Sequence, residues 1–362
     1  MFSINGNFLK IDGHFLYTDM QFNPLNLPPF TMRVRTNDGN PPSGMYTIDS
    51  TLVPGTTDVY DVYKPNEYWW GTVAGATNIV EVLGANTKGV KMMEEVFMNC
   101  SSLTSVALFD TSSVRTFYQM FDGCSSLTSV PLFNTSNATK MSFMFANCRR
   151  LISVPRFNTS KVTTMGSMFK GCTRLTSVPQ MDCSSVTDMA GMFYGCTKLT
   201  DVPSFNSHNV TDIRGMFYQC TSLVTAPQMN TSNVTDMRHM FHECESLQNV
   251  PVYDTHSVEV MGYLFYECNM LQTLPLLDMT NVRNMEYMCY GTRIGSIPAI
   301  NPVGVDFMDY AFYATYYVQS GALDLYNRVK NHNPSHNSTF AGCGIATTSG
   351  QAELDQIPSD WK

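Results

Sequence analysis

A cysteine recurs every 24 residues through the middle of this 362-residue chain, and that spacing constrains the fold more than any other feature. The column consists of Cys100, Cys124, Cys148, Cys172, Cys196, Cys220, Cys244 and Cys268. Counted from each cysteine, leucine stands at offset 3, valine mostly at offset 6, proline mostly at offset 7, and Met-x-x-Met-Phe mostly at offsets 17 to 21. A fixed period of this length indicates a solenoid, in which every repeat forms one coil that stacks on the next.

The order of residues within one repeat predicts the structure of a coil. The Leu-x-x-Val-Pro run predicts a short buried strand that ends at proline, because proline has no N–H for a ladder. Asn or Asp at offset 10 predicts a turn, and a following Thr, as at Thr211 or Thr235, would cap a short helix. Apolar residues at offsets 17, 20, 21 and 24 have the spacing of one helical face.

These features predict an α/β solenoid of the leucine-rich-repeat class, with about ten 24-residue coils that each contain a short parallel strand and a short helix. The solenoid is expected over residues 76–318. Because the end coils of such an array expose their core, caps are expected on both sides. Residues 31–75 predict a β cap in which Tyr68, Trp69 and Trp70 plug the first coil, and residues 319–362 predict a helical C-terminal cap with a helix over 321–330.

The first residues of the chain predict a separate small β element. Asn5-Gly6 and Asp12-Gly13 are dipeptides typical of tight hairpin turns, and β-prone residues flank both of them. Residues 1–30 therefore predict an N-terminal hairpin or three-stranded meander, followed by a proline-rich linker, that would serve as an attachment segment.

Composition excludes several classes of function. Charged residues make up only 14% of the chain, the formal net charge is −8 and no basic block is present, so a nucleic-acid partner is not expected. No apolar run approaches the ~18 residues of a membrane span, so membrane insertion is not expected either. The first twenty residues lack the continuous apolar segment of a secretory signal, which predicts either action in the cytoplasm or a route out of the cell that needs no such signal.

No catalytic motif stands out, so an enzyme is not expected, and neither is a cofactor or a metal site. The cysteine column is interpreted as a ladder of small buried hydrophobes, since metal sites use tight clusters such as CxxC. His239 and His242, followed by Glu243, could contribute to a metal site, but no complete ligand set is visible and a solvated face is the favoured interpretation.

One surface stripe is the candidate binding site. Offset 22 follows a buried Phe and should point outward, and in the C-terminal half it carries rings: Tyr194, Tyr218, His242, Tyr266, Tyr290 and Tyr313. Tyr263 and Tyr287 at offset 19 extend it. Exposed tyrosine offers rigid amphipathic area for contact with protein or sugar, although these rings could instead only cover the coils and lean on one another.

A second stripe, at offsets 1 and 2, carries Arg149, Arg150, Arg174 and Lys198 and is interpreted as a solvated edge.

The repeat Cys-x-Ser-Leu-Thr-Ser-Val-Pro followed by [Asn/Asp]-Thr-Ser-x-Val-Thr-x-Met-x-x-Met-Phe closely resembles the BspA-type leucine-rich repeats of bacterial surface proteins. That resemblance covers about two thirds of the chain and implies an adhesin or binding scaffold. The ends, with MFSINGNFLKIDG, MRVRTNDG and TFAGCG followed by TTSGQAELDQIPSDW, resemble repeat proteins encoded by phages of gut Bacteroides, including crAss-like phages.

The second resemblance implies a non-enzymatic bacteriophage virion protein, such as a fibre, a tail appendage or a head decoration, that presents the repeats for host-surface binding. Its N-terminal region would contact other virion proteins and its solenoid a host-surface protein or glycan. The expected location is the virion, and homo-oligomers are compatible with it. The alternatives are a bacterial surface adhesin of the BspA-like family, located on the cell surface, and a purely structural virion component.

Overall fold

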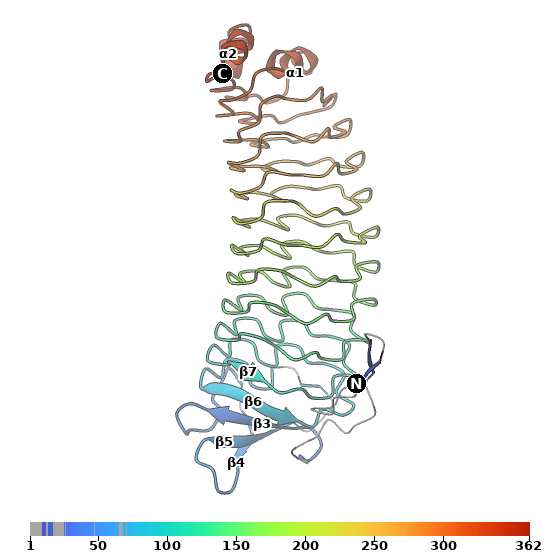
Figure 1. The fold of residues 1–362 in the computed structure, drawn as a ribbon, viewed down its shortest axis with the longest axis vertical. Helices are drawn as coiled ribbons and strands as arrows, with labels where there is room; N and C mark the ends of the chain where they lie inside the picture. The colour runs from blue at the N-terminus through green and yellow to red at the C-terminus, as the bar shows by residue number, and fades with distance from the viewer. Residues whose placement is uncertain are drawn as a thin grey trace.

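The computed structural model confirms a repeat solenoid, seen in Figure 1 as a long stack of coils with strands at one end and helices at the other. It describes residues 9–11, 14–16, 25, 27–46, 48–64, 68–69 and 71–362. Its elements are β1 (Leu9–Ile11), β2 (His14–Leu16), β3 (Thr31–Thr36), β4 (Ser50–Leu52), β5 (Val59–Tyr63), β6 (Ile79–Ala85), β7 (Ser105–Val106), α1 (Ala322–Val329), α2 (Thr348–Leu354) and the 3-10 helix η1 (Ser359–Trp361).

The N-terminal residues form a hairpin as far as they are described. β1 and β2 pair antiparallel, with Ile11 opposite His14, on either side of the predicted Asp12-Gly13 turn. The predicted turn at Asn5-Gly6, and with it the third strand of a meander, lies outside the described residues.

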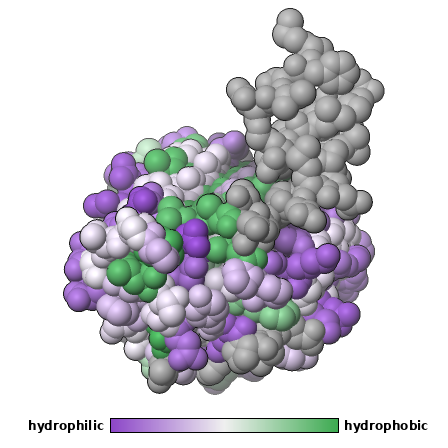
Figure 2. Space-filling view, turned by 90° about the horizontal axis from the view of Figure 1, so that it is seen from below, coloured by the Kyte–Doolittle hydropathy of each residue, from purple (hydrophilic) through white to green (hydrophobic). Residues whose placement is uncertain are grey.

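A five-stranded sheet in the order β4-β5-β3-β6-β7 covers the N-terminal end of the stack. The first four strands pair antiparallel, whereas β6 and β7 pair parallel with Val82 opposite Val106. Those two valines are one repeat apart, so the β6–β7 pair joins the sheet of the cap to the coils of the solenoid. Trp69 lies in the core with 1% of its surface exposed, as predicted, whereas Tyr68 is 46% exposed, so the prediction that it plugs the first coil is wrong. Trp70 lies outside the described residues. Seen from this end, apolar residues gather at the centre within a more polar rim (Figure 2).

The predicted continuous sheet of Leu-x-x-Val-Pro strands is wrong. Between residues 91 and 318, all of which are described, β7 is the only regular strand. Its coil is the one with Ala107 where most later coils have proline, and the Ala107 N–H donates to Val82 O at 2.8 Å. From Pro131 onward that donor is usually missing, and only scattered single bridges, such as Thr225 with Asn249, join neighbouring coils on this face.

The predicted helix in each coil is also wrong. The segment from offset 17 to offset 24, here named the turn segment, forms tandem β-turns in the coil of residues 117–124. Met120 N–H donates to Phe117 O at 3.1 Å, and Cys124 N–H donates to Phe121 O at 3.0 Å. The third residue of each turn is left-handed, with φ of 52° at Gln119 and 76° at Gly123. This is the backbone of a type II turn, which favours Gly or Asn at that position.

The remaining amides of the turn segment bond to the next coil instead of to their own. Phe117, Gln119, Phe121 and Gly123 donate to carbonyl oxygens of the following repeat, at distances of 3.0, 3.2, 2.9 and 2.8 Å. Alternate amides therefore close turns within a coil and link coils to each other. An adjacent row of parallel bridges, one residue before the segment, runs unbroken from Tyr68 to Ser335.

The helix-like spacing has a physical explanation. In two consecutive four-residue turns the first and last residues of each turn point inward, so offsets 17, 20, 21 and 24 are buried without a helix. Thr211 does not cap a helix, because its Oγ1 donates to Thr187 O in the preceding coil at 3.2 Å. The predicted Asn or Asp turn is present, as at Asn134, whose Oδ1 accepts the Ser136 N–H at 3.1 Å.

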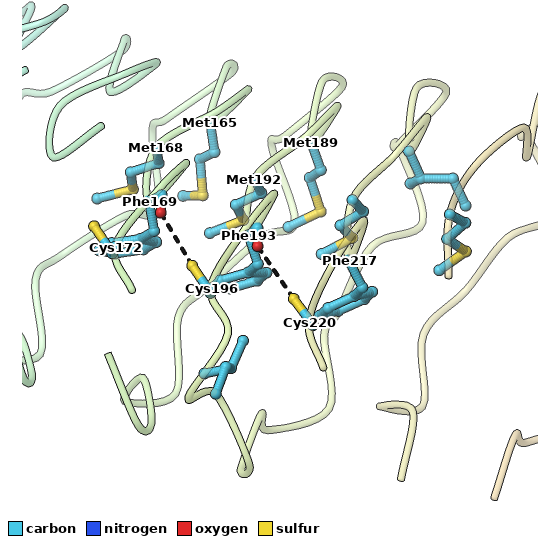
Figure 3. Packing of buried hydrophobic residues seen from close by; sticks show 14 of the residues in the cluster. Met165, Met168, Phe169, Cys172, Met189, Met192, Phe193, Cys196, Phe217 and Cys220 are labelled. Atoms are coloured by element: carbon cyan, nitrogen blue, oxygen red, sulfur yellow. Dashed lines mark hydrogen bonds between the residues drawn. The ribbon is translucent and has the colours of Figure 1, made fainter. Parts of the chain in front are cut away.

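The core is a set of ladders that run through the coils (Figure 3). The offset-21 phenylalanines stack with centroids 5.2 to 5.8 Å apart from Phe97 to Phe265. Each column cysteine also makes a hydrogen bond that the sequence did not predict. Cys196 Sγ donates to Phe169 O and Cys220 Sγ to Phe193 O, both at 3.1 Å. A thiol thus ties each coil to the one before it.

Buried Thr at offset 11 ties the coils in the opposite direction. Thr135 Oγ1 donates to Asn158 O of the next coil at 2.8 Å, and Thr159 Oγ1 donates to Asp182 O at the same distance. Cys183 stands at this offset, which explains why it lies outside the cysteine column.

The C-terminal end is closed by α1, α2 and η1. The helix predicted over 321–330 is present as α1, and Glu353 of α2 accepts the Leu323 N–H at its start at 3.1 Å. Trp361 packs over Phe340 at the end of the core. Its ring centroid lies 4.1 Å from the centroid of His336 and 6.2 Å from that of Phe340.

The left-handed positions of the turn segment predict a glycine effect that depends on φ. Gly195 has φ of 72°, and an added Cβ would meet the Gly171 backbone only at an ordinary contact distance of 3.8 Å, so Gly195→Ala tests backbone strain without a clash. We expect a loss of about 1 to 2 kcal/mol in the free energy of unfolding, measured by chemical denaturation. Gly295 has no such φ and similar space, so Gly295→Ala is the control and should cost less. Equal losses would contradict the turn assignment.

The phenylalanine ladder predicts a large cost for removing one ring. Phe217 is fully buried between Phe193 and Phe241, with centroids 5.4 and 5.6 Å away. Phe217→Ala should lower the free energy of unfolding by about 3 to 5 kcal/mol because it leaves a cavity. Ile152 is 47% exposed, and Ile152→Ala should change it by no more than about 0.5 kcal/mol. A Phe217 loss as small as the control would contradict the packing.

Candidate binding surface

The coils bring the predicted stripe together with a second row of rings, and we name the pair the aromatic ribbon. The first row, at offset 22, is the predicted set Tyr194, Tyr218, His242, Tyr266, Tyr290 and Tyr313. The second row, at offset 19, consists of His239, Tyr263, Tyr287 and Tyr310. Tyr263 and Tyr287 were predicted to extend the stripe, whereas His239 and Tyr310 of the same row were not predicted. Their shared offset was the signal that could have identified them.

Both rows are continuous stacks. Neighbouring centroids in the first row are 4.4 to 5.0 Å apart, with interplanar angles of 5° to 22°. In the second row every centroid distance is 4.7 Å. The spacing matches the 4.7–4.9 Å that separates hydrogen-bonded backbones, so inter-coil bonds place rings of equal offset at stacking distance.

The turn backbone explains why two rows form. Offsets 20 and 21 point into the core, as Met240 and Phe241 do, while the residues on either side of them remain outside. His239 and Tyr263 at offset 19 have φ of 59° and 60°, the left-handed conformation of the turn. The two rows run close together, with Tyr263 and Tyr266 5.6 Å apart between centroids.

Stacking limits what the aromatic ribbon can bind. Its tyrosines are half-buried, and His242 is only 7% exposed, so the prediction that His242 points into solvent is wrong. Each inner ring has a neighbour on both faces, and the outer end of the first row is covered by Lys170, whose Nζ lies 4.9 Å from the Tyr194 centroid. Ring faces are therefore unavailable to a sugar, and the open surface consists of ring edges and hydroxyl groups.

The hydroxyls of Tyr218, Tyr266 and Tyr290 stay protonated at neutral pH. Partial burial, reinforced by the Glu267 carboxylate, raises the pKa of Tyr266 to about 12. Burial is also the main reason that the pKa values of Tyr218 and Tyr290 are raised. Each of these hydroxyls can thus donate one hydrogen bond and accept another.

The two histidines of the ribbon bind each other. His239 Nδ1 lies 3.0 Å from His242 Nδ1, and His242 Nε2 lies 3.2 Å from Glu243 Oε1. Glu243 Oε2 also accepts the Gln219 Nε2–H at 2.8 Å. Burial lowers the pKa of both histidines, and the charge of Arg238 lowers that of His239 further. The expectation of a solvated face is wrong, since a neutral histidine pair bridges the tyrosine stacks.

Other chemistry is weakly represented in the described residues. All eleven cysteines are free and buried, and burial raises the pKa of the Cys100 thiol to about 12, which suppresses the reactive thiolate. No group of three His, Cys, Asp or Glu side chains in the described part of the chain could hold a metal ion. None of the helices found there is long and apolar enough to span a membrane.

The sequence matches one protein-family model, described as "Mycoplasma protein of unknown function, DUF285". The matches cover residues 71–177, 152–228 and 201–297, which together make up more than half of the chain. A search of curated proteins finds no match.

Solved structures that are similar to the chain are bacterial leucine-rich repeat proteins. A leucine-rich cell surface protein from Faecalibacterium prausnitzii is 21% identical, covers 75% of this chain and 79% of its own, and has a TM-score of 0.41. A leucine-rich repeat protein from Bacteroides ovatus is 18% identical over 74% of this chain and 81% of its own, with a TM-score of 0.28. One from T. pallidum is 22% identical over 54% and 72%, with a TM-score of 0.31.

The buried histidine pair predicts a pH-dependent stability. Because the folded-state pKa of both rings lies below the ordinary value of about 6.5, the unfolded chain binds protons first as the pH falls. The pair therefore destabilises the fold increasingly below about pH 6.5, until the folded-state pKa values are passed.

A variant that restores the ribbon consensus tests this effect. His239→Tyr combined with His242→Tyr removes both titrating rings, and its melting temperature should exceed that of the parent by an amount that grows as the pH falls below about 6.5. Scanning calorimetry of both proteins at a series of pH values measures the difference. A difference that is constant with pH would contradict the buried pair.

Proposed function

The chain belongs to the family described as "Mycoplasma protein of unknown function, DUF285", a description that assigns no activity, and we propose that it is a non-enzymatic binding scaffold. The observation that carries this proposal is the aromatic ribbon. Its ten rings come from consecutive coils and are held in register by the inter-coil hydrogen bonds. A rigid row of aromatic side chains offers contact area with little entropy left to lose on binding.

The geometry of the ribbon favours a particular kind of contact. Since ring faces are covered, a partner is recognised through a linear series of hydroxyl groups and ring edges spaced by the coil repeat. An extended protein segment or a glycan that offers hydrogen-bonding groups at similar intervals suits such a surface. We propose a cell-surface protein or glycan as the partner.

The biological setting that we propose is a bacteriophage virion, with the N-terminal region attached to other virion proteins and the solenoid facing the host. The resemblance of the chain ends to repeat proteins of gut Bacteroides phages supports it. The repeats themselves support a bacterial surface adhesin at least as well. Mass spectrometry of purified virions and surface labelling of intact cells separate the two, because the protein would be found in only one of them.

Removing hydroxyl groups without removing rings tests the ribbon. Tyr218→Phe, Tyr266→Phe and Tyr290→Phe in one variant keep the stacks, so the melting temperature should stay close to that of the parent. Each lost hydrogen bond is worth about 0.5 to 1.5 kcal/mol, so binding of the labelled protein to target cells should weaken about tenfold or more. Flow cytometry over a concentration series measures this.

The control for this experiment lies outside the ribbon. Tyr63 of the N-terminal sheet and Tyr317 are 40% and 47% exposed, and Tyr63→Phe with Tyr317→Phe makes the same chemical change outside the ribbon. Binding should be unaffected by it. If the ribbon variant binds as the parent does, the ribbon serves packing and the proposal fails.

A further inference from the structure

We propose that a groove across the first coils, at a site separate from the aromatic ribbon, binds an anionic polysaccharide through Arg115 and Lys161. The groove has a volume of about 450 Å³ and is lined by Lys91, Ser113, Arg115, Asn137, Thr139 and Lys161. These residues come from four successive repeats, at offsets 13 and 15. The groove therefore follows the axis of the stack.

Its charge departs from the pattern of the repeat. Offset 15 is Thr in five consecutive coils, from Thr139 to Thr235, whereas the two preceding coils carry Lys91 and Arg115 there. Offset 13 is mostly Ser or Asn, and Lys161 is the exception. The three cations thus gather in one place on a chain whose net charge is −8. None of the described residues that line the groove is acidic.

The two cations that carry the proposal are available to a ligand. Both side chains are exposed, and among the described residues Arg115 makes no side-chain hydrogen bond or ion pair. Lys161 Nζ donates one of its three protons to Asn137 Oδ1 at 2.9 Å, which orients it and leaves two donors.

The lining identifies the chemical class of the ligand. A guanidinium beside an ammonium suits sulfate or carboxylate groups, and the hydroxyl and amide groups of Ser113, Asn137 and Thr139 suit sugar hydroxyls. Beyond the groove the same two offsets form a neutral row of Thr with Ser or Asn as far as Thr235, which suits a linear chain of sugars. No aromatic residue lines the groove, so nucleic-acid bases find no stacking platform there.

The experiment compares two variants with equal changes in charge. Arg115→Gln with Lys161→Gln alters the groove, and Arg174→Gln with Lys198→Gln alters the exposed stripe at offset 2. Full-length proteins are titrated by isothermal calorimetry with dextran sulfate and with polygalacturonate, and with neutral dextran and single-stranded DNA as comparisons. The melting temperature of each variant verifies folding.

We expect the parent and the stripe variant to bind at least one of the acidic polysaccharides in a salt-dependent manner. The groove variant should bind it about tenfold more weakly or worse, as expected when charge-assisted contacts are removed. The arm that binds distinguishes sulfate from carboxylate as the recognised group. Equal weakening in both variants, equal binding of single-stranded DNA, or no binding of either acidic polysaccharide by the parent would overturn the proposal. The tyrosine variants test the ribbon independently.

Discussion

The hydrogen bonds that link one turn segment to the next are the interaction on which the rest of the molecule depends. Half of the amides in the segment close turns, and the other half donate to the following coil, as Phe121 does to Met144 O at 2.9 Å. This arrangement satisfies most backbone donors of the stretch 91–318, where β7 is the only regular element, and any buried backbone must meet that requirement. It also places equal offsets directly above one another, so that a side chain repeated in sequence becomes a ladder in space.

The period, the buried positions and the caps could be predicted from the sequence, because burial of a repeated apolar set leaves a direct record in composition and spacing. The backbone within a coil could not. Offsets 17, 20, 21 and 24 are inward both on a helix and in tandem turns, and periodicity alone does not separate the two. Gly123, Gly171 and Gly195 at offset 23 were the available clue, since left-handed residues interrupt a helix. The prediction of a strand at each Leu-x-x-Val-Pro run is wrong for a different reason. Proline lacks the backbone N–H that Ala107 donates to Val82 O.

The candidate sites were predictable to different degrees. The first tyrosine row could be identified from its offset, but its burial could not, because stacking at 4.4 to 5.0 Å depends on inter-coil spacing rather than on the local sequence. The histidine pair was predicted to lie on a solvated face, but His242 is stacked between Tyr218 and Tyr266. The cationic groove could not be predicted from the sequence. Its three cations, Lys91, Arg115 and Lys161, lie far apart in the chain and come together only when four coils stack.

Far-ultraviolet circular dichroism of the full chain tests the coil architecture most directly. We expect a spectrum with little helix, since among the described residues only the 8 of α1 and the 7 of α2 are α-helical. The remaining signal should be that of turns and parallel bridges. A strong double minimum of the kind that a helix in every coil would produce would contradict the central claim that each turn segment consists of tandem turns bonded to the next coil and not of a helix.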